Sequence, residues 1–510
     1  MLFNSWEFLI LLVITFVLHY LPMAGKAARV WQVLVLLVAS ALFYGWENPD
    51  LLYLLFGSCV INGIAVERIL HWKNPVRGEL NANVRRARYW LVGTVSLNLA
   101  FLVFFKYAGF LCNLVPQGIL PATWLDWVRT IPLPVGISFY TFQGLSLVVD
   151  VWRRDISPET EQRLGRTGVG RVASITDLSF YISFFPQLVA GPIVKAHEFV
   201  DQIGVKKARD IPWKTVTRCL ITGYFLKIFV ADNLAEQTAV LTLGPAHLAG
   251  NDPINLLSLL YGYSLQIFAD FGGYSLIAIG LGALFGYTFL ENFKFPYIAT
   301  SITEFWRRWH ISLSGWLRDY LYIPLGGNRK GPVRTYINLF LVMFLGGLWH
   351  GAEWKFALWG SLHGVFLALE RYFGGRAKRR RATQYPDQLT CPVPSRMGVL
   401  TRATLSWFVT FHLVTLLWLT FLMPDMASIG AFFQGLVSGK TGFSGPPIFS
   451  LLFYGSAVVL YHMWGWAQEH RGQLAQRLVN PWVEGIIHGL MVFLIVTNPG
   501  APRGFIYFQF

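Results

Sequence analysis

A histidine closes one of the most apolar segments of the chain. The run TYINLFLVMFLGGLWHGAE covers residues 335–353 and places His350 between Trp349 and Gly351. An imidazole can take up or release a proton near neutral pH. Titratable side chains are costly inside a membrane and usually mark functional sites there. We therefore interpret His350 as a candidate for proton transfer. The alternative is a histidine that only hydrogen-bonds a neighbouring helix or anchors at the membrane surface.

The densest polar stretch lies just upstream of this run. It reads ITEFWRRWHISLSGWLRDYLYIPLGGNRKG and covers residues 302–331. Pro324 and the following Gly326-Gly327-Asn328 predict a turn that ends the unit. An interfacial amphipathic helix, with tryptophans at headgroup level and arginines toward phosphate, explains the stretch as well as a functional role does. Helical spacing predicts that three of its polar residues share one face: Arg307, His310 and Ser314.

Two short helices would position His350. At about 1.5 Å per residue, the run from Arg334 to His350 rises about 24 Å. A bilayer's hydrocarbon core is roughly 30 Å thick. The returning run KFALWGSLHGVFLALER, residues 355–371, is equally short. We therefore expect a hairpin whose tip lies below the outer surface and is reached through a cavity, with His310 close to His350.

Composition sets the class of protein. Hydrophobic residues make up 54% of the 510 residues and charged residues only 14%, which is too little polar surface for a water-soluble globule. We expect an all-α polytopic membrane protein, although several apolar runs are too short or too broken to span alone. The candidate segments are 7–22, 30–46, 50–70, 89–112, 134–151, 174–193, 215–232, 254–286, 335–350, 355–372, 400–422, 449–466 and 484–498.

The positive charges predict the orientation. The net charge of +15 is concentrated in loops between apolar runs, at 77–88, 205–214 and 375–382. Basic loops stay in the cytoplasm, and this bias explains the charge without nucleic acid. The first apolar run has no basic start and no cleavage site, and Lys26 and Arg29 follow it. This pattern predicts an uncleaved helix with its N-terminus outside the cytoplasm.

The sequence predicts one membrane domain over residues 1–510. Its four cysteines have no paired spacing, so neither a disulfide framework nor a metal site is expected. No fixed-period repeat and no matching pair of broken helices is visible, which weakens a transporter interpretation. We expect N-terminal helices at 1–133, a catalytic core at 134–374, a cytoplasmic loop at 375–398 and C-terminal helices at 399–510.

Several long motifs resemble the membrane-bound O-acyltransferases, in particular the members that serve bacterial alginate O-acetylation. The main ones are FWRRWHISLSGWLRDYLYIPLGGNR and MFLGGLWHGAEWKFALWGSLHG. The chain departs from the expected pattern at Gly273, where a serine is expected, and after Gly375, where weak patterning leaves partner contacts open. The resemblance extends to PVGISFYTFQGLSLVVDVWR, FFPQLVAGPI, LQIFADFGGYSLIAIGLG, ENFKFPYIATSITEFW and the terminal FIYFQF, and it covers most of the chain.

The resemblance implies a multihelical fold with a central tunnel or funnel. In that family the histidine corresponding to His350 is regarded as catalytic, and His310 is the second signature position. Acyl transfer to a hydroxyl needs a base, and we assign that role to His350. Negative charge that develops on the thioester oxygen needs a donor, for which His310, Trp349 or a backbone N–H are candidates.

Further candidate substrate-binding residues lie in and near these motifs. Arginines can hold the phosphates of a cytoplasmic acyl donor, but they can equally snorkel to lipid phosphates. Asp270 is a costly intramembrane charge, and we expect a helix-packing or protonated hydrogen-bonding role for it. His363 is expected to pack in the core. The full set is Arg307, Arg308, Arg318, Trp306, Trp309, Trp349, Asp270, Ser314 and Asn328.

We therefore expect an enzyme that moves acetyl from a cytoplasmic thioester, such as acetyl-CoA, toward an exported polysaccharide, with no bound cofactor. The resemblance implies a bacterial inner membrane, a periplasmic SGNH-like acetyltransferase partner and a polysaccharide synthesis and export complex. The alternatives are a transporter or glycan flippase and a non-catalytic assembly subunit. A flippase should carry charges along several helices, whereas polar residues concentrate around His310 and His350. Alginate, cellulose and peptidoglycan all stay open as acceptors.

Overall fold

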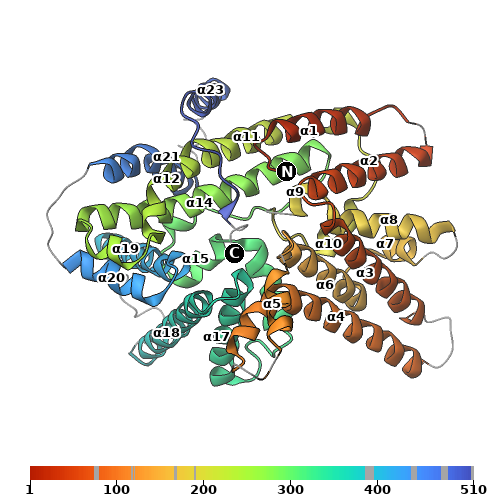
Figure 1. Cartoon of the computed structure of the whole chain (residues 1–510), viewed down its shortest axis with the longest axis horizontal. Coiled ribbons are helices and arrows are strands. Elements are labelled where there is room, and N and C mark those ends of the chain that lie inside the picture. Colours follow the sequence, from red (N-terminus) through yellow and green to blue (C-terminus); the bar gives the residue numbers. More distant parts are fainter. Residues whose placement is uncertain are drawn as a thin grey trace. The chain divides into compact units, whose positions relative to one another are not determined.

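The structure is a computed structural model that describes most of the chain. The described residues form helices and turns, with no strand among them (Figure 1). Parts of the basic loops and of the motifs FFPQLVAGPI and FIYFQF fall outside the described residues. The description omits residues 24, 74–79, 117–118, 120, 132, 166–168, 189–190, 385–395, 438–444, 473–479 and 507–510.

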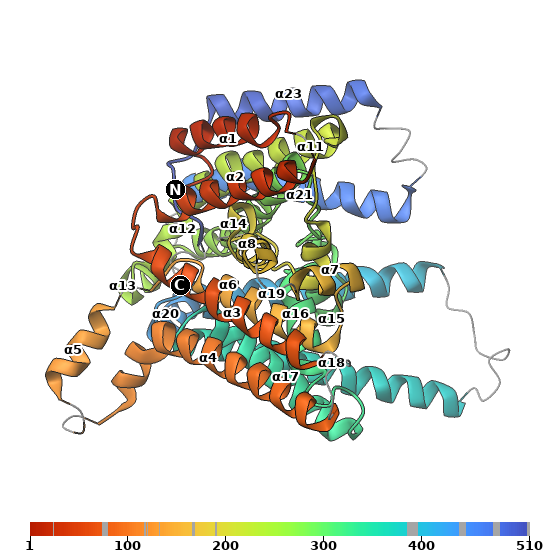
Figure 2. The same cartoon turned by 90° about the vertical axis from the view of Figure 1, so that its right-hand side faces the viewer.

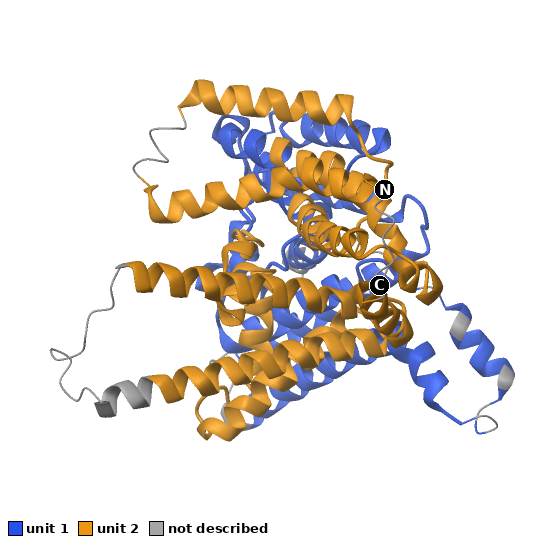
Figure 3. Ribbon diagram, turned by 90° about the vertical axis from the view of Figure 1, so that its left-hand side faces the viewer, with its two compact units in different colours: residues 1–220, 275–290 blue, residues 221–274, 291–510 orange. Residues whose placement is uncertain are grey.

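The chain divides into two compact units, coloured in Figure 3. One unit consists of residues 1–220 and 275–290, and the other of residues 221–274 and 291–510. Two of the three boundaries fall within helices α11 (Trp213–Tyr224) and α14 (Pro253–Leu284), and the third follows Leu290. Both candidate histidines belong to the second unit.

In the first unit, helices α3, α4 and α6 pack against one another. Helix α1 lies beside α2 (Figure 2), and α1 begins at a serine cap, because the Ser5 side chain accepts a hydrogen bond from the backbone N–H of Phe8. The helices are α1 (Trp6–His19), α2 (Gly25–Gly45), α3 (Leu51–Lys73), α4 (Leu80–Leu114), α5 (Ala122–Thr130), α6 (Ile137–Arg153), α7 (Pro158–Leu164), α8 (Val169–Ser183), α9 (Phe185–Leu188) and α10 (Ala196–Phe199).

The second unit holds further elements, of which α17 and α18 form its most extensive helix pair. These are η3 (Phe225–Ala231), α12 (Asp232–Thr238), α13 (Pro245–Ala249), η5 (Pro296–Ile298), α15 (Ile302–Arg308), α16 (Ile311–Leu317), η6 (Arg318–Tyr322), α17 (Gly331–His350), α18 (Trp354–Gln384), α19 (Arg396–Leu422), α20 (Met426–Val437), α21 (Pro446–His470) and α23 (Pro481–Thr497).

Seven of the described helices are long and apolar enough to cross a membrane. The all-α polytopic prediction is therefore confirmed, and α6 and α8 are too short to be among the seven, as expected for some of the apolar runs. The seven spans are Ala27–Gly45, Leu51–Lys73, Ala82–Leu114, Pro253–Leu284, Gly331–His350, Met397–Leu422 and Pro446–His470.

The predicted segment 215–232 is a helix with a π-helical turn, η3, between α11 and α12. Helix α14 approaches this helix closely at Gly273, the position where a serine was expected. A Cβ atom at Gly273 would lie 2.8 Å from the carbonyl oxygen of Gly223 and 3.0 Å from the backbone nitrogen of Lys227. Glycine at this position therefore permits a backbone contact that a serine would obstruct.

Helices α17 and α18 form the predicted hairpin, and Figures 1 and 2 both show them side by side. The predicted length of its first arm was wrong, because α17 begins at Gly331 and not at Arg334. Its 20 residues rise about 30 Å, enough to cross a hydrocarbon core. Helix α18 is also longer than expected, since it continues through the predicted loop to Gln384.

The helical spacing predicted for Arg307, His310 and Ser314 is wrong. Helix α15 ends at Arg308, and His310 has a left-handed backbone with a φ of 45° before α16 begins. Arg307, His310 and Ser314 therefore do not share one helical face. The predicted turn after Pro324 is present, with positive φ angles at Gly326 and Gly327.

Candidate active site

His350 lies in a buried aromatic environment at the end of α17. Only 4% of the residue is exposed. Its ring contacts Trp349, with ring centroids 5.0 Å apart, Trp359 at 5.3 Å and Phe421 at 5.3 Å. The rings come from α17, α18 and α19, so three helices fix the position of the imidazole.

Backbone hydrogen bonds hold His310 beside residues 291–295. The Ile311 N–H donates to the Asn292 carbonyl over 2.9 Å, and the Lys294 N–H donates to the Arg308 carbonyl over 2.9 Å. Two bonds on either side of His310 thereby stabilise its left-handed backbone, which is unfavourable for a residue other than glycine. The ring is 1% exposed and packs edge-on against Phe271, with centroids 4.6 Å apart.

Asn292 determines the proton position on neutral His310. Its Oδ1 accepts hydrogen bonds from the Ser312 hydroxyl, over 2.8 Å, and from the Ser312 backbone N–H, over 3.3 Å. His310 Nδ1 lies 3.1 Å from the same oxygen, so the nitrogen must carry the proton and donate it. The other ring nitrogen, Nε2, is then an acceptor. Of the candidate oxyanion donors, Trp349 and a backbone N–H fit this arrangement better than neutral His310.

The structure brings both histidines to the same indole. The ring centroids of His310 and Trp349 are 6.1 Å apart, and those of Trp349 and His350 are 5.0 Å apart. The two histidines are far apart in the sequence, so only the tertiary fold can bring them to one aromatic ring. A shared site for His310 and His350 is therefore geometrically available.

His363 and Trp306 support the aromatic residues that surround His350. His363, expected only to pack in the core, accepts a hydrogen bond at Nδ1 from the indole N–H of Trp306 over 3.2 Å. The ring of His363 also packs on Trp359, with centroids 4.8 Å apart, and Trp359 contacts His350. Trp306 also contacts Trp359 directly, with ring centroids 5.6 Å apart, so it lies two contacts away from His350.

The aromatic wall includes residues that sequence reasoning missed. Trp309, one of the predicted residues, is 1% exposed and packs on Trp418, with centroids 5.1 Å apart. Trp418 in turn stacks on Trp359 at 5.6 Å. Trp418 and Phe421 occur in an apolar run that looks like any lipid-facing helix in the sequence. Asn292 was also missed. In the sequence ENFKFPY its one distinguishing feature is that it is a polar residue just before several aromatic residues.

The predicted arginines lie in different surroundings. Arg308 donates to Glu304 and Glu469 through bonds of 2.8 to 2.9 Å, and all three of its guanidinium nitrogens are engaged. The hydrogen bonds to Glu469, and then those to Glu304, raise the pKa of Arg308 above its ordinary value. Arg307 is exposed, and Arg318 is exposed and pairs with Asp319 over 2.7 Å. A donor phosphate at Arg308 would have to displace an ion pair.

The remaining predicted residues lie outside the histidine contacts. Asn328 accepts a hydrogen bond from the Tyr322 hydroxyl, and Ser314 is half-buried in α16. Asp270 accepts from Lys227 Nζ over 2.7 Å at one oxygen and from the Ile506 N–H over 2.8 Å at the other. Both oxygens are thus acceptors, which favours the helix-packing role over the protonated one.

Comparison with known proteins identifies the family. The model described as MBOAT, membrane-bound O-acyltransferase family, matches residues 127–386. The matched region spans half of the chain and includes His310, His350 and Trp359. The chain belongs to this family. It is a multi-pass membrane O-acyltransferase.

Three relatives show which reactions similar proteins are named for. The probable alginate O-acetylase AlgI of Pseudomonas aeruginosa is 37% identical over 86% of this chain and 76% of its own length. The peptidoglycan O-acetyltransferase of Helicobacter pylori is 32% identical over 87% of this chain and 81% of its own length. The teichoic acid D-alanyltransferase of Bacillus subtilis is 30% identical over 47% of this chain and 59% of its own length. Each of the three names describes transfer of an acyl group, to alginate, peptidoglycan or teichoic acid.

Proposed function

We propose that this acyltransferase moves an acetyl group from a cytoplasmic thioester, such as acetyl-CoA, to the outer side of a bacterial inner membrane for O-acetylation of an exported polysaccharide. Alginate is the preferred acceptor pathway, because the relatives named for it combine about 35 to 40% identity with long coverage. The peptidoglycan enzyme of similar coverage is the second candidate. A periplasmic SGNH-like acetyltransferase would complete the transfer.

The contact of both histidines with Trp349 carries this proposal. In the reaction, a hydroxyl oxygen attacks the thioester carbonyl carbon, a C–O bond forms and the C–S bond breaks. His350 accepts the hydroxyl proton as the bond forms and returns it to the departing thiolate. The Trp349 indole N–H, or a backbone N–H, donates to the carbonyl oxygen while it carries negative charge.

The experiment uses the full chain in a host without its own polysaccharide O-acetylation, expressed together with the candidate partner and an alginate synthesis system. Labelled acetate is supplied, and base-labile label in the exported polysaccharide is measured. We expect label with the wild-type chain, and release of free thiol when acetyl-CoA is added to inverted membrane vesicles. Well-expressed protein that yields neither label nor thiol release would contradict the proposal. Thiol release without labelled alginate would redirect it to another glycan.

A further inference from the structure

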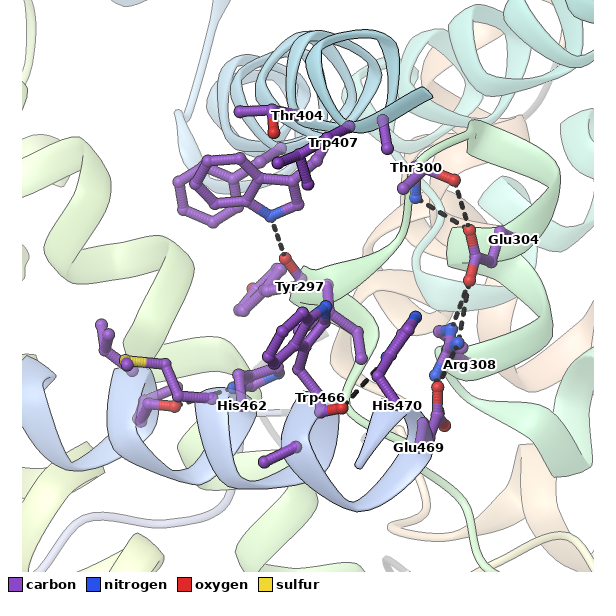
Figure 4. A pocket seen from close by; sticks show the side chains of 18 of the residues that line it. Tyr297, Thr300, Glu304, Arg308, Thr404, Trp407, His462, Trp466, Glu469 and His470 are labelled. Atoms are coloured by element: carbon purple, nitrogen blue, oxygen red, sulfur yellow. Dashed lines mark hydrogen bonds and ion pairs between the residues drawn. The ribbon is translucent and has the colours of Figure 1, made fainter. Parts of the chain in front are cut away.

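A cavity of about 940 Å³ lies between α19 and α21 in the second unit (Figure 4). Both helices also pack against η5, which contributes Tyr297 and Ile298 to the floor of the cavity. The volume is at the upper end of the roughly 300 to 1,000 Å³ of typical small-molecule sites. It is a different space from the aromatic contacts of His350, since neither His350 nor His310 lines it.

The walls of the cavity are suited to hydrocarbon. Helix α19 contributes Leu400, Trp407 and Phe411, and α21 contributes Val459 and Met463. The outer surfaces of both helices are apolar, with Leu405, Phe408 and Leu460 all more than one third exposed. Because both helices are candidate membrane spans, the gap between them faces the acyl chains of the bilayer and not water.

The depth of the cavity matches one leaflet. On α21 its lining extends from Val458 to His470, a rise of about 18 Å at about 1.5 Å per residue. Half of a hydrocarbon core of roughly 30 Å is about 15 Å. The lining of α19 covers a similar length, from Leu400 to Phe411. Since α19 begins at Arg396 and α21 ends at His470, the cavity runs from helix ends at the headgroup level toward the middle of the membrane.

The end at headgroup level carries charges of both signs. Figure 4 shows Glu304, Arg308 and Glu469 gathered at one end of the cavity, beside His470. Lys294, outside the lining, lies 3.7 Å from Glu469. The two carboxylates, Glu304 and Glu469, therefore balance the charge of the two cations, Arg308 and Lys294.

This balance favours a zwitterionic headgroup over an anionic one. Glu304 and Glu469 have acceptor sites that can serve an ammonium group. Arg308 has no guanidinium nitrogen without a partner, so it cannot bind a phosphate without losing a carboxylate. The exposed His470 ring and the Trp466 indole N–H can serve a neighbouring phosphate diester, and tryptophan is favoured at the membrane interface.

We propose that this cavity is a binding site for one phospholipid with an amine-bearing zwitterionic headgroup, of the phosphatidylethanolamine type. Its ammonium lies at Glu304 and Glu469, and its acyl chains fill the space beside Tyr297 and Val458. The bound lipid supports the active site indirectly. Tyr297 packs on Trp309, with ring centroids 6.1 Å apart, and Trp309 belongs to the aromatic wall that reaches His350 through Trp418 and Trp359.

The test measures lipid bound to the full-length, delipidated protein by native mass spectrometry. Dioleoyl phosphatidylethanolamine and dioleoyl phosphatidylglycerol are added separately at equal concentration. We expect at least tenfold tighter retention of one phosphatidylethanolamine molecule. Ala403→Trp on α19 and Val459→Trp on α21 fill the cavity from opposite walls, so misfolding of one variant leaves the other informative. Each should abolish the tight site, whereas Val409→Trp, on the exposed face of α19 outside the lining, should retain it.

A further variant tests which headgroup the site prefers. Glu469→Gln removes one of the two carboxylates and should reduce the preference for phosphatidylethanolamine over phosphatidylglycerol about tenfold or more. Equal retention of both lipids by the wild-type protein would overturn the proposal, as would retention unchanged by both cavity-filling variants. Displacement of the lipid by equimolar acetyl-CoA would assign the cavity to the acyl donor and would also overturn it.

Discussion

Gly347 and Gly360 meet across the α17–α18 hairpin, one helical turn before His350. A Cβ atom on Gly347 would lie 2.9 Å from the Cα of Gly360, and one on Gly360 would lie 2.3 Å from the carbonyl oxygen of Met343. The two helix backbones are therefore in direct contact. This contact places Trp359 of α18 against the His350 ring at the end of α17. The position of His350, the candidate base, thus depends on glycine at both 347 and 360.

Replacing Gly360 by alanine should separate the two helices. Overpacking of this kind costs about 1 to 3 kcal/mol, and a misplacement of about 1 Å can lower a rate about 100-fold. We expect Gly360→Ala to lower the melting temperature in detergent and to reduce acetyl transfer more than protein yield. Gly374→Ala is the matched control, because it lies on the same helix and its Cβ would meet no atom within 4 Å. Equal activity of the two variants would show that the close contact does not position His350.

His350→Ala should abolish acetyl transfer while the protein still inserts into the membrane. Loss of a positioned base typically costs about 100- to 10,000-fold in rate. The removed ring packs among aromatic side chains, so its removal leaves the backbone hydrogen bonds of α17 intact. The measurement is acetyl ester content of the polysaccharide, normalised to membrane protein. His488→Ala is the control, because His488 lies in α23 and not among the rings around His350. Its ester content should stay near that of the wild type. Unchanged ester content in the His350 variant would eliminate the general-base role.

The hairpin could be predicted from the sequence because its signals are local. Two apolar runs joined by WHGAEW specify two antiparallel helices, and the basic residues around Arg334 mark one end. The starting residue was missed, because the run was counted from Arg334, whereas the helix begins at Gly331 with a proline in its first turn, where proline is favourable. Local pattern therefore gave the element and its neighbour but not its length.

The break at His310 could not be predicted in this way. FWRRWHISLSGW contains no glycine or proline before Gly315, so its local preference is a continuous helix. The left-handed backbone of His310 depends on hydrogen bonds to the segment around Asn292, which is a tertiary effect. Trp418 and Phe421 were missed for a related reason. In a membrane helix, an aromatic residue that lines a site and one that faces lipid have the same sequence signal.

Asn292 should be required to orient His310. Asn292→Leu removes the acceptor of the His310 Nδ1 proton and leaves the Ser312 donors without their partner. We expect about a 100-fold loss of turnover, the size associated with a misplacement of about 1 Å in an active site, because His310 packs on Trp349 beside His350. The apparent KM for the donor should change little. Ser312→Ala keeps the bond between Asn292 and His310 and should lose far less. A similar loss in both variants, with lowered melting temperatures, would indicate that Asn292 is needed for folding and not for His310.

The orientation of the protein in the membrane follows from its basic loops and can be tested on two exposed residues. Arg209 lies in the basic loop 205–214 with its side chain 77% exposed, and basic residues resist translocation. Asp425 is exposed just after the end of α19, a helix that follows the basic residues 376–381 at the end of α18 in the chain. One crossing by α19 would place Asp425 on the side opposite to its start.

In a background without native cysteines, an impermeant thiol reagent applied to intact cells should label Asp425→Cys and leave Arg209→Cys unlabelled until the membrane is opened. The two positions serve as controls for each other, since both should react fully in detergent. Labelling of Arg209→Cys alone in intact cells would reverse the orientation. It would then place Glu469 at the end of α21, with Glu304 and Arg308 of α15, on the outer leaflet, and the direction of acyl transfer would have to be reassigned.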